Sequence, residues 1–261
     1  MFRMTSKIKE YANQLTIAET TRIGISPLSE ADSSLTVDEA YAIQLENIQR
    51  KVEEGHRIVG KKIGLTSKAM QTLLGVNEPD YGHLLDSMVI ENGGRVNIDK
   101  VLQPRVEAEI AFVLKRDLKG PNVTTLDVLQ ATDYIVPALE IVDSRVQDWK
   151  IKLIDTVADN ASSGFYVLGG TPTKVTDIDL ELVGTVFSKN GEIVNTGVGA
   201  AALGNPAYCV AWLANRLADF DITLKAGEVI LSGALSAAVN AEKGDNFTAR
   251  FAHLGQVSVQ F

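Results

Sequence analysis

The protein has 261 residues, of which 45% are hydrophobic and 22% charged, and a formal net charge of −8 at pH 7. The length fits one large domain, or one domain with a small appendage, and the composition is typical of a soluble globular protein. No basic stripe is visible in this acidic sequence, which argues against a nucleic-acid partner. An anionic substrate would therefore have to be met by local positive charge, such as a bound cation or a placed lysine.

The sequence also indicates a cellular compartment. It has no run of about 20 apolar residues, which a membrane helix needs, and residues 1–7 lack the apolar core of a signal peptide. The single cysteine, Cys209, excludes an intramolecular disulfide and suits a reducing compartment. Because it lies in the apolar run Tyr208–Trp212, we predict that it packs in the core. We expect a cytoplasmic protein without a membrane partner.

The first 56 residues are predicted to be helical. Thr36 and Glu39 have the spacing of a capping box, which marks the start of a helix that we expect to end at Gly55. A weaker helix is expected before it, from Ser6 to about Arg22.

From Arg57 onward, short β-branched runs alternate with turn signals. Arg57–Thr66 is predicted to be a strand, and Ser67–Gly75 a short helix with its stop. Arg105–Leu114 alternates clearly between two faces, as a strand does. Tyr134–Val142 is a second strong strand, in which Pro137 favours an edge position or a bulge.

The C-terminal half continues the β-rich pattern. Asn190-Gly191 predicts a hairpin, Asn205-Pro206 predicts the start of a helix, and Glu228–Phe261 predicts three short strands. We therefore predict an α+β fold that is mainly a β roll or barrel-like sandwich with an N-terminal helical cap. The expected division is a helical region at 1–56 and a β-rich catalytic domain at 57–261.

Three glutamates form a candidate metal site. Glu107 and Glu109 project from the same face of their predicted strand, because strand side chains repeat every two residues. Spacing alone also fits the solvated face of an amphipathic strand. Glu140, however, lies in an otherwise apolar run, and a buried carboxylate is costly unless it is paired or coordinates a metal. Three carboxylates without a nearby histidine or cysteine suit Mg²⁺ or Mn²⁺ rather than zinc.

Two further residues are candidates for proton transfer. Lys62 lies in the glycine-flanked run Gly60–Thr66, and a partly buried lysine near a cation would have a lowered pKa. The alternative is that Lys61 and Lys62 are merely solvated. Asp80 lies in a segment that is a turn by composition, where it could be a general base or simply bond its own backbone. From the residues alone, the second interpretation of Asp80 is favoured.

The remaining polar residues are less specific. Asp155–Ser163 gathers polar side chains that either cap a helix or line a pocket. His56, His83 and His253 are scattered without the spacing of metal ligands, so we expect surface or supporting roles. No G-x-S-x-G elbow supports a serine hydrolase.

Five segments carry the residues just described, namely Gly60–Ser67, Glu78–Gly82, Gln103–Glu109, Pro137–Arg145 and Asp155–Ser162. Together they resemble the hydratase/decarboxylase group of the fumarylacetoacetate hydrolase superfamily, from about Thr36 to the C-terminus. Asp148–Lys152 and Leu74–Val76 are most similar to the branch that hydrates 2-hydroxypenta-2,4-dienoate (2-oxopent-4-enoate) in aromatic meta-cleavage pathways. Ser163 stands where close hydratase relatives have cysteine. The alternatives are 4-oxalocrotonate (2-oxo-3-hexenedioate) decarboxylase and 2-oxohept-4-ene-1,7-dioate hydratase.

The resemblance implies a fold, a cofactor and roles for single residues. It implies a fumarylacetoacetate-hydrolase-type β roll, a homo-oligomer, a complex with a related decarboxylase, and metal-dependent hydration of a small 2-oxo or 2-hydroxydienoic acid to 4-hydroxy-2-oxopentanoate. A C–C hydrolase of the wider superfamily would need a histidine near the metal, and the matching segments contain none. The implied site residues are Glu107, Glu109 and Glu140 for Mg²⁺ or Mn²⁺, Lys62 and Asp80 for proton transfer, and Leu65, Thr66 and Ser162 for substrate contact.

Overall fold

The computed structural model describes residues 6–261, except for the side chains of Leu73 and Leu74. Residues 1–5, which carry most of the segment judged against a signal peptide, lie outside the described residues. None of the helices in the described range is long and apolar enough to cross a membrane.

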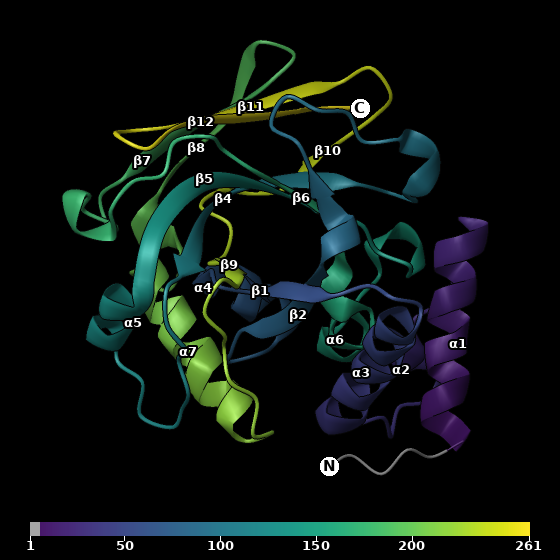
Figure 1. Ribbon diagram of the computed structural model, residues 1–261. Helices are drawn as coiled ribbons and strands as arrows, with labels where there is room; N and C mark the ends of the chain where they lie inside the picture. Colours follow the sequence, from purple (N-terminus) through teal and green to yellow (C-terminus); the bar gives the residue numbers. More distant parts are fainter. Residues whose placement is uncertain (1–5) are drawn as a thin grey trace.

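A strongly curled sheet of eight strands forms the centre of the molecule (Figure 1). Its strands are β1 (Ile58–Gly64), β2 (Asp80–Leu85), β3 (Val89–Ile90), β4 (Arg105–Leu114), β5 (Thr132–Val142), β6 (Ser163–Leu168), β9 (Val229–Leu231) and β10 (Val239–Asn240). The order across the sheet is β2-β1-β9-β4-β5-β6-β3, and β10 pairs with β4. Most neighbours are antiparallel, but β1 runs parallel to β9 and β3 runs parallel to β6.

A smaller sheet of four strands packs over β5. It consists of β7 (Gly184–Lys189), β8 (Glu192–Val198), β11 (Asn246–Phe251) and β12 (Gly255–Gln260), in the order β12-β11-β7-β8. β11 and β12 contact β5 directly. Phe187 and Phe247 stack with their ring centroids 5.8 Å apart and help to fill the core beneath this sheet. The hairpin predicted at Asn190-Gly191 is the β7–β8 connection.

The helices flank the two ends of the curled sheet (Figure 1). They are α1 (Ser6–Thr21), α2 (Leu28–Ala31), α3 (Val37–Glu53), α4 (Lys68–Leu74), α5 (Thr125–Ala131), α6 (Leu153–Ala158) and α7 (Pro206–Ala218). α1 packs on α3, and α3 packs on α6, while α7 contacts α5 and β1 on the other side. The predicted α+β class with N-terminal helices is therefore confirmed. The division at residues 56 and 57 stays a prediction.

Two local expectations need correction. Pro137 is not at an edge, because β5 lies between β4 and β6. Proline is accommodated there because β6 ends at Leu168, opposite Ala138. The amide of Gly169, the residue after Leu168, donates to the carbonyl of Pro137. The C-terminal tail forms four strands and not three, since the short β10 adds to β4.

The two faces of β4 divide the interior. Val106, Ala108, Ile110 and Phe112 point into the main apolar core. Residues 107, 109 and 111 point to the opposite face, where a smaller apolar cluster adjoins the glutamates. The strand is therefore buried on both faces, so its carboxylates do not form the solvated edge of an amphipathic strand.

The capping box of α3 offers a test of local stability. Thr36 Oγ1 accepts from the Glu39 amide, and the Glu39 carboxylate accepts from the Thr36 amide at 2.9 Å. We expect Thr36→Ala to lower the free energy of unfolding by about 1 kcal/mol, since the Glu39 amide loses its acceptor and the capping box is broken. Urea denaturation measures the loss. Thr36→Ser keeps the hydroxyl and should stay close to the wild type; an equal loss in both variants would contradict the capping explanation.

Candidate active site

Three carboxylates converge on the inner face of the curled sheet. Glu107 on β4 lies directly opposite Glu140 on β5, and Glu109 follows two residues later on the same face. One oxygen from each carboxylate lies within 4.8 Å of the others. Glu109 and Glu140 are fully buried, while Glu107 keeps a small exposed fraction. The antiparallel register thus brings together glutamates that are more than 30 positions apart in the sequence.

This arrangement is electrostatically unfavourable in the protein alone. Burial and the charge of Glu140 raise the pKa of Glu107 to about 7. Burial, followed by the charges of Glu140 and Glu107, raises the pKa of Glu109 well above its usual value. Burial also raises the pKa of Glu140, although Lys62 opposes this effect. Nearby like charges and desolvation both disfavour the ionised carboxylates.

The hydrogen bonding of these carboxylates is incomplete. Glu109 Oε2 accepts from the Gly233 amide at 2.8 Å. Within the described residues, Glu109 Oε1 and Glu140 Oε2 accept no hydrogen bond, although both atoms are buried. Buried polar atoms without partners are rare, and three converging carboxylates are the donor set that hard divalent cations prefer. The residues present therefore fit a divalent metal ion.

Lys62 reaches this cluster from β1. It is buried, its Nζ lies 3.1 Å from Glu140 Oε1, and it donates to the carbonyl of Ala161 at 2.9 Å. Burial alone would lower the pKa of Lys62, but the charges of Glu140 and Asp80, with smaller effects from the other two glutamates, raise it above its usual value. The lowered pKa expected from the sequence is wrong for the protein alone, because the carboxylates surround the ammonium group. The solvated alternative for Lys62 is also excluded.

Asp80 is a strand residue and not a turn residue. It begins β2 directly opposite Gly64 of β1, and its side chain is buried. A Cβ atom at Gly64 would lie 2.2 Å from Asp80 Oδ1, so glycine is needed there for the carboxyl group to fit. The hydroxyl of Thr156 lies 3.5 Å from Asp80 Oδ2. Burial raises the pKa of Asp80, against the opposing charge of Lys62.

The three predicted substrate contacts lie around the same centre. Leu65 has a φ of 56° and turns the chain away from the end of β1. Thr66 is buried against Gly233, the residue whose amide binds Glu109. Ser162 Oγ lies 3.3 Å from the hydroxyl of Thr156. Their substrate-binding role stays a prediction, since geometry alone places them near the carboxylates.

Some contributors were not singled out from the sequence. The carbonyl of Ala161 and the hydroxyl of Thr156 both belong to the polar segment 155–163, which was recognised only as a helix cap or a pocket lining. The helix-capping expectation is confirmed, since the Asp155 carboxylate accepts from the Lys152 amide at the start of α6. The amide of Gly233 carried no sequence signal, because a backbone donor leaves no residue-type pattern.

The other face of β1 has a separate arrangement. Lys61 is buried and binds Glu228 at 2.8 Å, so it is not solvated either. His83 lies opposite Lys61 in the β1–β2 register and is buried with its Nδ1 2.9 Å from Gln44 Oε1. A surface role for His83 is therefore wrong, and burial lowers its pKa to about 3. Because it lies on the face away from Lys62, it does not supply a water-activating histidine to the carboxylates.

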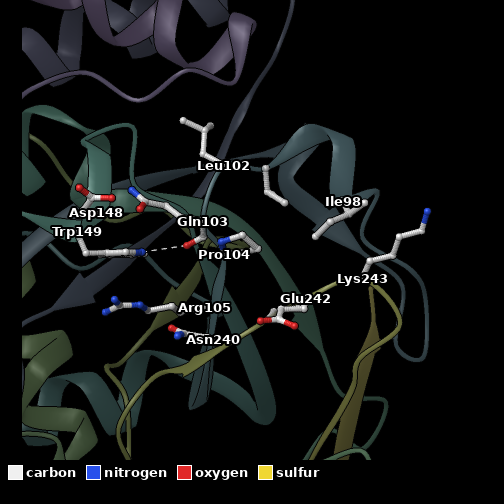
Figure 2. Close-up of a pocket in the computed structure, with 12 residues that line it drawn as sticks. Ile98, Leu102, Gln103, Pro104, Arg105, Asp148, Trp149, Asn240, Glu242 and Lys243 are labelled. Carbon is white, nitrogen blue, oxygen red and sulfur yellow. Dashed lines mark hydrogen bonds between the residues drawn. The ribbon is translucent and has the colours of Figure 1, made fainter.

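A pocket of about 670 Å³ opens at the start of β4 (Figure 2). Figure 2 shows Trp149 donating from its indole N–H to the Gln103 carbonyl, at 3.0 Å. The guanidinium of Arg105 lies 4.2 Å from the centre of the Trp149 ring. None of the sequence-predicted site residues lines this pocket. Arg105 shares the face of Glu107, two residues away, so the pocket lies beside the buried carboxylates rather than around them.

Comparison with known proteins identifies the family to which this chain belongs. Residues 59–261 match the family model described as fumarylacetoacetate (FAA) hydrolase C-terminal. The chain belongs to the fumarylacetoacetate hydrolase family. A 2-keto-4-pentenoate hydratase from Paraburkholderia xenovorans (strain LB400) is 51% identical to it over 91% of this chain and 88% of the relative. A 2-oxo-hept-4-ene-1,7-dioate hydratase from Escherichia coli is 43% identical over 96% of both chains. These relatives are hydro-lyases by name.

A solved structure of this family is also similar over its whole length. The 4-oxalocrotonate decarboxylase from Pseudomonas putida G7, complexed with magnesium and adipate, is 40% identical with a TM-score of 0.96, covering 100% of both chains. The same decarboxylase complexed with calcium and acetate has a TM-score of 0.94. This decarboxylase thus binds divalent metal ions, which the donor set of Glu107, Glu109 and Glu140 also suits.

The repulsion among the carboxylates predicts opposite effects with and without metal. In the absence of divalent ions, burial of the ionisable Glu109 carboxyl beside two others is costly, and Glu109→Gln removes this cost. We therefore expect the free energy of unfolding to rise by about 1 kcal/mol. With Mg²⁺ or Mn²⁺, the wild type should gain stability and the variant should gain little. Thermal denaturation with EDTA and with each metal measures both effects. Glu192→Gln, on exposed β8, serves as the control. A metal-induced shift as large in Glu109→Gln as in the wild type would remove Glu109 from the metal site.

Proposed function

We propose that this protein is a metal-dependent hydratase that converts 2-hydroxypenta-2,4-dienoate (2-oxopent-4-enoate) to 4-hydroxy-2-oxopentanoate. The observation that carries the proposal is the joint presence of three converging carboxylates, a buried lysine and a buried aspartate in a chain about 50% identical to hydratases of this substrate class. The site is lined by groups that suit an anionic 2-oxo acid only when a cation offsets the carboxylates.

Glu107, Glu109 and Glu140 would hold Mg²⁺ or Mn²⁺. When bound, the ion supplies a Lewis acid that stabilises negative charge on the substrate's carboxylate and 2-oxygen. The protein's contribution is to fix the three carboxylates on one rigid face, with Glu109 held by the Gly233 amide. Leu65, Thr66 and Ser162 would contact the substrate around this centre.

Lys62 and Asp80 would move the protons of the reaction. The 2-hydroxyl proton leaves and C5 gains a proton, which gives the 2-oxo-3-enoate. Water then adds its oxygen to C4, and C3 takes up a proton, which completes 4-hydroxy-2-oxopentanoate. Both residues are buried beside the carboxylates, where they would pass protons to and from the substrate. The carbonyl of Ala161 and the hydroxyl of Thr156 fix the direction of their side chains.

A second candidate function is decarboxylation of 4-oxalocrotonate. It is favoured by the TM-score of 0.96 with the decarboxylase from Pseudomonas putida G7. The seven-carbon diacid hydratase from Escherichia coli adds a third candidate, since its identity of 43% is only slightly lower than that of the pentenoate hydratases. All three need negative charge stabilised next to a 2-oxo group, so they share the same centre.

The assembly expected from the resemblance is a homo-oligomer. The edge strand β8 supports this proposal, because Ile193, Val194 and Val198 leave apolar side chains exposed on it. A complex with a related decarboxylase and a place in aromatic meta-cleavage catabolism remain predictions of the same resemblance.

A product assay tests the proposed function directly. The enzyme with Mg²⁺ is supplied separately with 2-hydroxypenta-2,4-dienoate, 2-oxo-3-hexenedioate and 2-oxohept-4-ene-1,7-dioate. We expect rapid loss of diene absorbance and formation of 4-hydroxy-2-oxopentanoate from the first substrate only, abolished by EDTA. Release of CO₂ from the second substrate alone would instead assign the decarboxylase activity, and turnover of only the third would assign the diacid hydratase.

The role of Lys62 is tested by removing its ammonium group. Lys62→Met keeps most of the side-chain volume, so we expect the variant to fold and to bind Mn²⁺ within about threefold of the wild type, while kcat falls by about 10³-fold or more. Exchange of the C3 protons of 2-oxopentanoate in D₂O, followed by NMR, measures proton transfer without hydration. Lys68→Met, on α4, is the matched control. Wild-type exchange in Lys62→Met would exclude this lysine from proton transfer.

A further inference from the structure

A short segment next to the active site has an unusual backbone. Asn160, Ala161 and Ser162 all have positive φ values, of 53°, 50° and 55°. Residues with a Cβ rarely adopt this left-handed conformation, and three in succession persist only where the surroundings hold them. The segment must therefore be fixed by contacts outside itself.

The left-handed turn determines what the segment presents to the site. It directs the Ala161 carbonyl to Lys62 Nζ at 2.9 Å. It also brings Ser162 Oγ to 3.3 Å from the hydroxyl of Thr156, which in turn approaches Asp80. The segment thus contacts Lys62 directly and Asp80 through Thr156, so it contributes to the orientation of both groups proposed to move protons.

Arg145 holds both ends of the segment. Its Nη2 donates to the carbonyl of Asp159 at 2.6 Å, and its Nη1 donates to the carbonyl of Ser163 at 2.8 Å. These two carbonyls directly flank residues 160–162. The Asp159 carboxylate pairs with Arg145 Nε and also accepts from the Arg145 backbone amide at 2.8 Å. The planar guanidinium therefore bridges the segment from one end to the other, which a single ammonium group cannot do.

The ion pair between Arg145 and Asp159 is shielded from water. Arg145 is 7% exposed and Asp159 is 3% exposed. A buried ion pair of this kind contributes little net stability relative to apolar side chains, because both charges lose their hydration. Its presence is better explained by the geometry that it imposes on the segment between the two carbonyls.

A second anchor fixes the segment to β2. The Asn160 side chain accepts from the His83 amide at 2.8 Å and donates to the His83 carbonyl at 2.9 Å. The Asn160 carbonyl lies against Gly82, where a Cβ atom would approach it to 2.4 Å. Gly82 is paired with Lys62 in the β1–β2 register. Asn160 thus attaches the segment to β2, the strand that begins with Asp80 and pairs with β1 at Lys62.

We propose that Arg145, Asp159 and Asn160 are positioning residues of this enzyme, which hold the left-handed segment so that it orients Lys62 and Asp80. They touch neither the carboxylate cluster nor the groups that we assign to substrate contact, apart from their own chain neighbours in the segment. The inference rests on the proposed proton-transfer roles of Lys62 and Asp80. It adds a set of residues, remote from the metal ligands, whose loss lowers turnover without weakening metal binding.

Arg145→Lys is the most informative variant. Lysine keeps the charge beside Asp159 but cannot bridge both carbonyls. We expect hydrogen exchange of the amides in 159–163 to accelerate at least tenfold and kcat to fall at least tenfold, with KM and the Mn²⁺ dissociation constant within about twofold of the wild type. Mass spectrometry, steady-state kinetics and Mn²⁺ titration by electron paramagnetic resonance measure these quantities. Glu228→Gln is the matched control, since it disrupts the buried Lys61–Glu228 pair on the other face of β1.

The outcomes separate the inference from general destabilisation and from the proposed function. If Arg145→Lys loses no more kcat than Glu228→Gln at a similar melting temperature, and exchange in 159–163 is unchanged, the positioning role is overturned. Asn160→Ala, which keeps the ion pair, provides a second test should Arg145→Lys fail to fold, and the same split between kcat and KM is expected. Hydrogen exchange and a crystal structure showing the Lys62–Ala161 contact do not need turnover. They test whether Arg145 and Asn160 hold the segment even where the wild type fails to hydrate the dienoate.

Discussion

The burial of like charges on one face of the curled sheet is the constraint on which the site depends. The β4–β5 register places Glu107 opposite Glu140, and the two-residue repeat adds Glu109 on the same side. Burial raises the pKa of all three, so the protein alone holds carboxyl groups in an environment that disfavours their ionised form. A divalent cation reverses this preference. The fold thus holds an electrostatically unfavourable arrangement in place. The Gly233 amide donates to Glu109, Lys62 pairs with Glu140, and Gly64 leaves room for the Asp80 carboxyl.

The sequence predicted the parts of the site that depend on local periodicity. Strand alternation placed Glu107 and Glu109 together, and the apolar run around Glu140 marked a buried carboxylate. The turn predicted around Asp80 is wrong, because its neighbours Pro79 and Gly82 are typical turn residues, whereas pairing with β1 makes Asp80 the first residue of a strand. The pKa of Lys62 was misjudged for a related reason. Its direction depends on carboxylates that only the tertiary structure brings next to it.

The backbone-mediated part of the site left no pattern to predict. Glycine is the residue that usually signals a left-handed backbone, yet the three left-handed residues 160–162 include none. Arg145 lies in the segment that follows β5, where a basic residue would ordinarily be read as solvated. Its role emerges only when the carbonyls of Asp159 and Ser163 are seen to lie on either side of its guanidinium. A sequence shows which side chains are present, but it does not show in which direction a backbone carbonyl or amide points.

The N-terminal helices support the strand and the helix that lead to the active site. Gln44 of α3 donates to the carbonyls of Tyr81 and Val157 and contacts His83, so it joins the helical layer to β2 and α6 at once. β2 begins with Asp80, and α6 leads into the left-handed segment. β2 and α6, which help to orient Lys62 and Asp80, are therefore held together by α3, a helix that contributes no residue to the carboxylate cluster. Hydratases and a decarboxylase are both similar to this chain over most of its length, so the overall fold does not separate the two reactions. We expect that choice to depend on side chains that face the far end of the substrate, outside the carboxylates and their supports.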